Sequence, residues 1–480
     1  MNPFAEYENY DATGLAELVR QGQVSALELL DAAWQRMEQR NPAINAVCWP
    51  DLAAGRAAAR AATKNMPFAG VPFLLKDGGA SATGLRLTYG SEFSKNNFPV
   101  RDSALAERYR KAGLVFFGRT TTPEYGINVA TESPIYGSPT RNPWHLDFSP
   151  GGSSGGAAAA VAAGIVPMAH GSDGGGSLRI PASYCGLFAL KPTRARMPHG
   201  PGYGESWSGM ATSHVISRSV RDSALALDAT HGPDSGAPYH APAAQQAFLA
   251  GLALPLRPLR IGFITTTWSG EPVHGDCGAA VQYAAQLCSN LGHHVQPARL
   301  PGFDFELLAR TMRSLVCANT AAEMDAMALQ LGLPIERAGF EAATWNAREI
   351  GLAMSASDYL NALHTLHRLA RPFAPMFEAH DVILTATLAE PPARVGQFAM
   401  NRDYVSHRTA TLAHASLTPL ANVTGQPAMS VPLHWNADGL PIGVQFVGPY
   451  GDETVLLQLA AQLEQACPWF DRLAPLARSG

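Results

Sequence analysis

Two clusters of glycine and serine constrain this chain more than any other feature of its sequence. The first is GGSSGG at residues 151–156, and the second is SDGGGS at residues 172–177. Consecutive glycines lose much backbone entropy on folding, so a fold that keeps them needs their conformations or their bare N–H groups. Two such clusters within a short stretch therefore predict one functional site rather than two unrelated turns.

The first cluster allows several interpretations. An alanine-rich segment that favours a helix follows it, and N–H groups at a helix N-terminus can bind a phosphate. The G-K-[ST] continuation of a Walker A loop is missing. Residues 151–155 also match G-x-S-x-G, the turn that carries the nucleophile of α/β-hydrolases, which would make Ser153 the nucleophile. A flexible turn explains the same residues without any chemistry.

The second cluster leads directly into Ser177. Backbone N–H groups beside a serine form a natural oxyanion hole next to a nucleophile. Asp173 and Arg179 flank the glycines with opposite charges. We expect these two side chains to brace the loop.

Lys76 ends the apolar run FLLK at residues 73–76. Burial disfavours an ammonium group and lowers its pKa from about 10.4. A buried Lys76 is therefore a candidate for a neutral general base. The alternative is a lysine at a strand end whose long side chain reaches the surface.

Helical and strand-like patterns alternate along the chain. Ser25 and Glu28 form a capping box before a helix with one apolar face, and Asp452 is a candidate N-cap for another. Short apolar runs that predict strands lie at 71–75, 114–117, 261–264, 382–384 and 442–448. This alternation predicts an α/β fold with a sheet covered by helices on both faces. Dense proline and glycine predict loops at 192–204 and 232–258, and we expect a less regular middle portion from 195 to 415.

Composition narrows the class of protein. Only 15% of residues are charged, against roughly 25% in typical soluble proteins, which suits one large domain. The net charge of −4 without a Lys/Arg run argues against nucleic-acid binding. Six scattered cysteines without a C-x-x-C pair indicate buried thiols and no metal site. The longest Ala/Val-rich run is too short for a membrane span, and the N-terminus lacks the apolar core of a signal peptide, so a cytoplasmic location is expected.

The order of these motifs resembles the amidase signature family. LLKD, GGSSGG and SDGGGSLRIPAS follow one another, and further similar segments are GRTTTPEYG at 118–126, RNPW at 141–144, NVTGQPA at 422–428 and GLPIGVQ at 439–445. Ala386 departs from the proline that is usual there. The resemblance implies a single α/β domain over 1–480, with a mixed, twisted sheet sandwiched between helices. Its parts would be N-terminal helices (1–70), a catalytic core (71–195), a variable substrate-pocket region (195–415) and C-terminal core strands with a helix (416–480).

The resemblance also implies a Ser–cis-Ser–Lys triad. Ser177 would be the nucleophile, Ser153 the bridging serine after a cis peptide bond, and Lys76 the base, with the reaction passing through an acyl-enzyme. The N–H groups of Gly174, Gly175, Gly176 and Ser177 would form the oxyanion hole. Ser154, Asp173 and Arg179 would support the site. No metal or organic cofactor is expected.

The narrower resemblance is to bacterial cyclic nylon-oligomer hydrolases, aryl acylamidases and urethane-cleaving amidases. Its substrate would be a small amide, with carbamates and esters as further candidates, and Tyr136, Trp207 and Cys317 would line the pocket. His170 and His199 are expected to be structural. The sequence leaves the oligomeric state open, with a homodimer as one candidate.

Three alternative functions remain. One is the glutamine-hydrolysing component of a tRNA-dependent amidotransferase, against which Ile180 argues. The others are an α/β-hydrolase and a non-catalytic binding protein.

Overall fold

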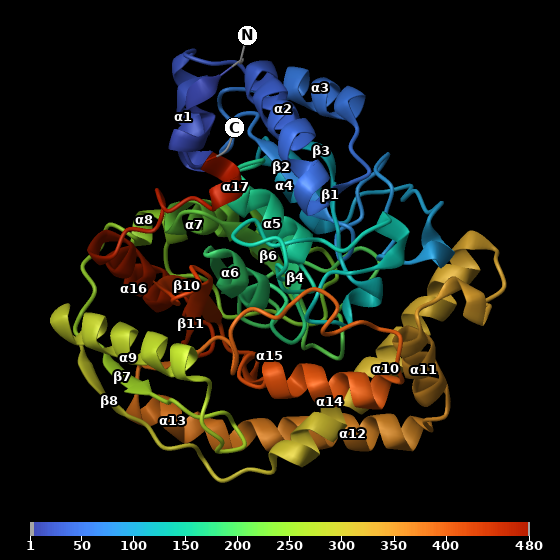
Figure 1. The fold of residues 1–480 in the computed structure, drawn as a ribbon, viewed down its shortest axis with the longest axis vertical. Coiled ribbons are helices and arrows are strands. Elements are labelled where there is room, and N and C mark those ends of the chain that lie inside the picture. The colour runs from blue at the N-terminus through green and yellow to red at the C-terminus, as the bar shows by residue number, and fades with distance from the viewer. Residues whose placement is uncertain (1–3, 479–480) are drawn as a thin grey trace.

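One large sheet collects strands from nearly the whole chain (Figure 1). The computed structural model describes residues 4–478, and within that range eleven strands form the order β1-β3-β2-β4-β6-β5-β10-β11-β9-β7-β8. Their bounds are β1 Val47–Cys48, β2 Pro72–Lys76, β3 Val115–Thr120, β4 Met168–Asp173, β5 Phe188–Lys191, β6 Thr212–Ser217, β7 Arg260–Phe263, β8 His294–Pro297, β9 Val382–Ala386, β10 Ala428–Trp435 and β11 Pro441–Val447. Strand β2 pairs in parallel with β3 and β4, whereas β4 is antiparallel to β6. The predicted mixed sheet is confirmed.

Helices flank this sheet and complete a single α/β domain. The α-helices are α1 Ala12–Gln21, α2 Ala26–Ile44, α3 Leu52–Ala61, α4 Ala104–Lys111, α5 Gly155–Ala162, α6 Arg179–Cys185, α7 Val220–Thr230, α8 Phe248–Gly251, α9 Gly275–Asn290, α10 Phe305–Leu331, α11 Ala342–Leu352, α12 Ala356–Ala370, α13 Ala374–Ala379, α14 Tyr404–His414, α15 Pro419–Thr424, α16 Glu453–Ala466 and α17 Pro475–Arg478. The short 3-10 helices are η1 Ala5–Asn9, η2 Glu92–Ser94, η3 Glu124–Gly126, η4 Pro134–Tyr136, η5 Arg337–Gly339 and η6 Arg371–Phe373. Within residues 4–478, none of the helices combines the length and apolarity that crossing a lipid bilayer requires.

The local sequence signals agree with these elements. Ser25 and Glu28 make the capping box that starts α2, and Leu30, Ala33 and Met37 lie buried along one face of that helix. Asp452 caps α16 by accepting a hydrogen bond from the N–H of Val455. Each of the five apolar runs overlaps a strand, namely β2, β3, β7, β9 and β11.

The middle portion is more regular than its sequence predicts. Residues 195–415 contain four strands of the sheet, β6 to β9, and the 27-residue helix α10. In Figure 1, helices α10 to α13 run along the lower right and the bottom of the domain. The expectation was wrong because proline and glycine are concentrated in the two loop stretches, while the remainder carries ordinary helix-forming residues.

The sheet brings the two sequence clusters and the lysine to one edge. Lys76 is the last residue of β2, Asp173 is the last residue of β4, and these parallel strands are neighbours. The carboxyl ends of parallel strands meet at the same edge of a sheet, which is where α/β proteins commonly bind ligands. Helix α5 follows the first cluster, α6 follows the second, and every residue of both helices is buried.

A buried ion pair ties the loop after β5 to α16. Arg196 lies 2.9 Å from Glu453, and the two side chains are 3% and 0% exposed. Glu453 also accepts a hydrogen bond of 2.9 Å from the N–H of Thr193. Burial raises the pKa of Glu453, but the hydrogen bonds and charge of Arg196 outweigh it and leave the pKa lowered. The pair therefore anchors the start of the loop that carries Trp207.

Replacing Glu453 with Gln should destabilise the protein by about 3–5 kcal/mol, because Arg196 would remain buried without a countercharge. Urea unfolding followed by fluorescence measures the change. The control is Asp31→Asn, which removes the exposed partner of Arg56 and should cost less than about 1 kcal/mol. Equal, small losses in both variants would contradict an anchoring role for the buried pair.

Candidate active site

Lys76 is buried, with an exposed fraction of 2%. Its Nζ lies 2.6 Å from Ser153 Oγ and 2.9 Å from Ser172 Oγ. Burial lowers the pKa of Lys76 to about 7, although the charge of Asp173 acts in the opposite direction. The surface alternative for this side chain is therefore excluded, and the amine is neutral above that pH.

A cavity opens in front of this lysine. Lys76, Ser153 and Ser177 all line it, as do Gly174 and Trp207. Ser153 is buried, whereas Ser177 is partly exposed to the cavity. Segments far apart along the chain thus present one amine and two hydroxyl groups to the same space.

The first cluster is held from both sides. The peptide bond between Gly152 and Ser153 is cis. Thr131 Oγ1 donates to the carbonyl of Gly151 over 2.9 Å, and Thr122 Oγ1 donates to the carbonyl of Ser153 over 2.9 Å. Ser154 Oγ donates to the carbonyl of Ser172 (3.1 Å) and accepts from its N–H (3.2 Å), which links this cluster to the end of β4.

The second cluster is held by Asp173 and Arg179, whose side chains are both 0% exposed and 2.9 Å apart. The guanidinium reaches both carboxylate oxygens and also donates to Asn422 Oδ1 at 2.7 Å. Burial raises the pKa of Asp173, but the charge and hydrogen bonds of Arg179 prevail and hold it at about 2. The brace expected from the flanking charges is present.

Asp173 also takes one of the four N–H groups expected to form an oxyanion hole. The N–H of Gly176 donates to Asp173 Oδ1 over 2.7 Å, so it is not available to bind an oxyanion. Gly176 has φ +132°, and a Cβ there would lie 2.3 Å from Thr418 Oγ1, which explains the glycine. The N–H groups of Gly174, Gly175 and Ser177 remain as candidates, because no hydrogen bond within residues 4–478 uses them.

Of the three residues expected in the pocket, the structure brings only Trp207 to the cavity. Tyr136 lies behind it and donates from its hydroxyl to Asp77 Oδ2 over 2.8 Å. Cys317 is fully buried within α10, in an apolar cluster with Tyr125 and Met324. Burial raises the pKa of this thiol to about 12. Neither Tyr136 nor Cys317 is among the residues that line the cavity.

The two histidines differ in position. His170 lies under the site, where its Nδ1 accepts the N–H of Lys76 over 3.3 Å, and burial holds its pKa well below the ordinary value. His199 lines the cavity, and burial lowers its pKa as well.

Sequence reasoning missed several residues of the cavity, among them Ser172 and Glu323. Ser172 contacts Lys76 and belongs to the second cluster, where its position next to Asp173 was the available signal. Glu323 reaches the cavity from α10, and no motif surrounds it.

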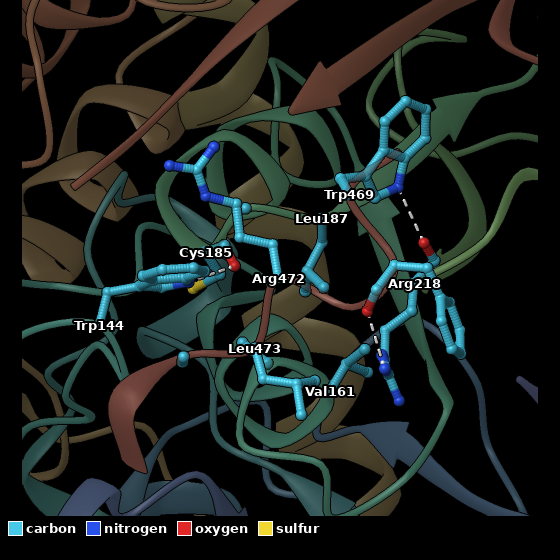
Figure 2. Close-up of a pocket in the computed structure, with 12 residues that line it drawn as sticks. Trp144, Val161, Cys185, Leu187, Arg218, Trp469, Arg472 and Leu473 are labelled. Carbon is cyan, nitrogen blue, oxygen red and sulfur yellow. Dashed lines mark hydrogen bonds between the residues drawn. The ribbon is translucent and has the colours of Figure 1, made fainter. Parts of the chain in front are cut away.

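Figure 2 shows a separate, smaller cavity that residues 469–474 help to line. Trp144 Nε1 donates to the carbonyl of Cys185 over 2.8 Å, and Trp469 Nε1 donates to the carbonyl of Arg218 over 2.9 Å. The indole N–H groups that line this cavity are therefore used in hydrogen bonds between distant segments of the chain. None of the predicted catalytic residues lines it.

Comparison with known families decides which of the open interpretations holds. The family model described as Amidase matches residues 28–457. The chain belongs to the amidase signature family. It is therefore an amide-bond hydrolase, and both the α/β-hydrolase and the non-catalytic interpretations are excluded.

Similar members of the family include a cyclic-dimer hydrolase and an aryl acylamidase. The 6-aminohexanoate-cyclic-dimer hydrolase of Paenarthrobacter ureafaciens is 36% identical over 96% of each chain. A structure of 6-aminohexanoate cyclic dimer hydrolase with substrate matches with a TM-score of 0.93, over 98% of this chain and 99% of the other. A bacterial aryl acylamidase is 28% identical with a TM-score of 0.89, over 98% and 99% of the two chains. A component of the Glutamyl-tRNA(Gln) amidotransferase of Thermotoga maritima, at 24% identity and a TM-score of 0.78 over 97% and 96%, shows a shared fold alone.

The packing of Trp207 on the second cluster yields a test. A Cβ on Gly174 would lie 2.6 Å from the Trp207 ring. Gly174→Ala should therefore destabilise the protein by about 1–3 kcal/mol through overpacking. In a Trp207→Ala background the same change should cost less than about 0.5 kcal/mol, because the obstructing ring is gone. A double-mutant cycle of urea unfolding measures the difference, and equal costs in both backgrounds would show that the ring does not restrict the loop.

Proposed function

We propose that this enzyme hydrolyses small, largely apolar amides, whether linear, cyclic or aryl, with carbamates and esters as additional substrates. The observation that carries the proposal is the buried amine of Lys76, 2.6 Å from Ser153 Oγ in the cavity that Ser177 also lines. The similar cyclic-dimer hydrolase and aryl acylamidase support this class of substrate.

The mechanism follows from the properties of the three groups. A serine hydroxyl is a weak nucleophile until a neighbouring base removes its proton. Neutral Lys76 accepts the proton of Ser153, and Ser153 accepts the proton of Ser177. Ser177 Oγ then forms a bond to the carbonyl carbon of the amide. Lys76 is suited to this role because burial lowers its pKa to about 7.

The tetrahedral intermediate carries a negative oxygen that needs donors. The N–H groups of Gly174, Gly175 and Ser177 supply them, each worth about 3–4 kcal/mol in comparable sites. Ser153 passes a proton to the nitrogen of the leaving group as the C–N bond breaks. A water molecule, activated through the same chain, attacks the acyl-enzyme, and Ser177 regains its proton as the acid leaves.

The glutamine-hydrolysing alternative is not favoured. The amidotransferase component resembles the chain less closely than the cyclic-dimer hydrolase does, at 24% against 36% identity. Ile180 occupies the position where that branch typically has glutamine.

The purified enzyme should hydrolyse members of a panel of anilides, cyclic lactam dimers and carbamates faster than glutamine. Product release followed by chromatography measures this. Ser177→Ala should lower the rate by roughly 10³-fold or more, because the attacking oxygen is lost. Glutamine as the best substrate, or full activity in Ser177→Ala, would refute the proposal.

Activity toward an uncharged anilide should rise with pH through about 7 and then level off, because Lys76 cannot accept a proton while it is an ammonium. The matched control is Lys191→Met. Burial also lowers the pKa of Lys191 to about 7, but its Nζ donates to the carbonyl of Pro192 outside the cavity. Lys191→Met should keep the rise of activity with pH, whereas Lys76→Ala should lose the activity. An acid optimum, or full activity in Lys76→Ala, would contradict a lysine base.

A further inference from the structure

A carboxyl group without a role in the proposed mechanism also lines the cavity. Glu323 belongs to α10, and its side chain borders the same space as Lys76 and Ser177. Helix α10 comes from the middle of the chain, whereas Lys76 ends β2, Ser153 lies just before α5 and Ser177 follows β4. Glu323 therefore forms part of the cavity wall that α10 supplies.

The other acidic side chain of the cavity, Asp77, is already satisfied. It accepts hydrogen bonds from Trp49 Nε1 over 3.0 Å, from the Tyr136 hydroxyl over 2.8 Å and from the N–H of Thr88 over 2.7 Å. Burial lowers the pKa of the Arg119 guanidinium, and the nearby negative charge of Asp77 acts in the opposite direction. This carboxylate is thus part of the protein framework and is not available to a ligand.

Glu323 is placed differently. Among residues 4–478, no ion pair includes it. Burial is the main influence on its pKa, and no lysine or arginine affects that pKa. The phenol groups of Tyr89, Tyr125 and Tyr203 lie near enough to feel its charge. The carboxyl group therefore shares the cavity wall with the aromatic side chains of Tyr89, Tyr125 and Trp207 and lacks a countercharge among the described residues.

Such a group is costly to keep unless something binds to it. Glutamate is rarely withdrawn from water without a partner, and desolvation here raises the pKa of Glu323 to about 7. A cation beside it would restore the carboxylate and offset the lost hydration. Aromatic faces around a carboxylate also suit an ammonium group, because a cation is attracted to both.

We propose that Glu323 is a specificity residue that binds a primary ammonium group of the substrate, at a distance from the amide that is cleaved. The enzyme would then prefer amides of ω-amino acids or of diamines over uncharged amides of the same length. This inference rests on the proposed function, since it assigns the substrate class of the same site. Glu323 takes no part in bond making or breaking.

The test uses substrates that differ only in the charged group. One series is ω-aminoacyl para-nitroanilides of several chain lengths, and the other is alkanoyl para-nitroanilides with a methyl group in place of the ammonium. Monoacylated diamines and the matching alkylamides place the same difference on the leaving group. In Glu323→Gln, kcat/KM for the best ammonium-bearing substrate should fall about 10–100-fold, because a hydrogen bond to a charged group is lost. The uncharged partner should change less than about threefold.

Two features of the design separate recognition from a structural role. Glutamine keeps the size of the glutamate side chain and an oxygen that can accept a hydrogen bond, so the change removes the charge and preserves the shape of the wall. The control Asp325→Asn removes an exposed carboxylate of the same helix, 2.6 Å from Arg348, and should leave the preference at its wild-type value. Equal losses for charged and uncharged substrates in Glu323→Gln, or no preference in the wild type, would overturn the proposal.

A binding measurement keeps the inference separate from the hydrolysis itself. Calorimetry on Ser177→Ala should show tighter binding of the ammonium-bearing amides than of the uncharged ones, and Ser177→Ala/Glu323→Gln should lose that difference. Selective binding without turnover in the wild type would refute the proposed function and leave the role of Glu323 standing. Turnover without selective binding would support the proposed function and refute the role of Glu323.

Discussion

The site depends on the buried pair of Asp173 and Arg179. A charge pair taken wholly out of water gains little stability on balance, because the cost of desolvation is comparable to the attraction between the charges. Here the remaining donors and acceptors are also satisfied. Arg179 donates to the carbonyl of Thr418 (2.8 Å) and to Gln445 Oε1 (2.6 Å), and Asn422 donates to Asp173. The result is a loop whose backbone directions are set by several bonds at once.

These partners come from elements that are distant in the sequence. Asp173 ends β4, Asn422 lies on α15, and Gln445 lies on β11. The C-terminal strands and helix therefore hold the loop of the proposed site in place, even though none of the expected catalytic side chains comes from them. This explains why one large domain, in place of several small ones, suits this chemistry: the loop geometry is assembled only when the whole sheet has formed.

Much of the site could be predicted from the sequence, because its signals are local. Lys76 ends an apolar run, Ser153 and Ser177 sit in glycine clusters, and the charges that brace the loop flank it directly. Glu323 could not be predicted, since a single glutamate on a long helix looks like any exposed residue until tertiary packing turns it inward. The predictions for Tyr136 and Cys317 were wrong for the same reason. Their residue types suggested a pocket wall, but long-range packing keeps both out of the cavity lining.

In the fold, too, local sequence signals were predictable and long-range packing was not. Strands with continuous apolar runs could be predicted, as could helices with clear caps. Strand β4 was not predicted, because it contains His170, Gly171 and Ser172 and lacks a strand-like pattern. It lies in the sheet because β2 and β6 pair with it on either side. Burial in that position replaces the apolar signal that most central strands carry.

Trp207 has a consequence for how enzymes of this kind can diversify. Its ring lines the cavity and also presses against Gly174 in the loop that is expected to hold the oxyanion. A change that reshapes this wall for a new substrate also alters the support of the loop. Selection for new specificity at this position therefore acts on turnover as well, because Trp207 packs against both Gly174 and the apolar residues of α10.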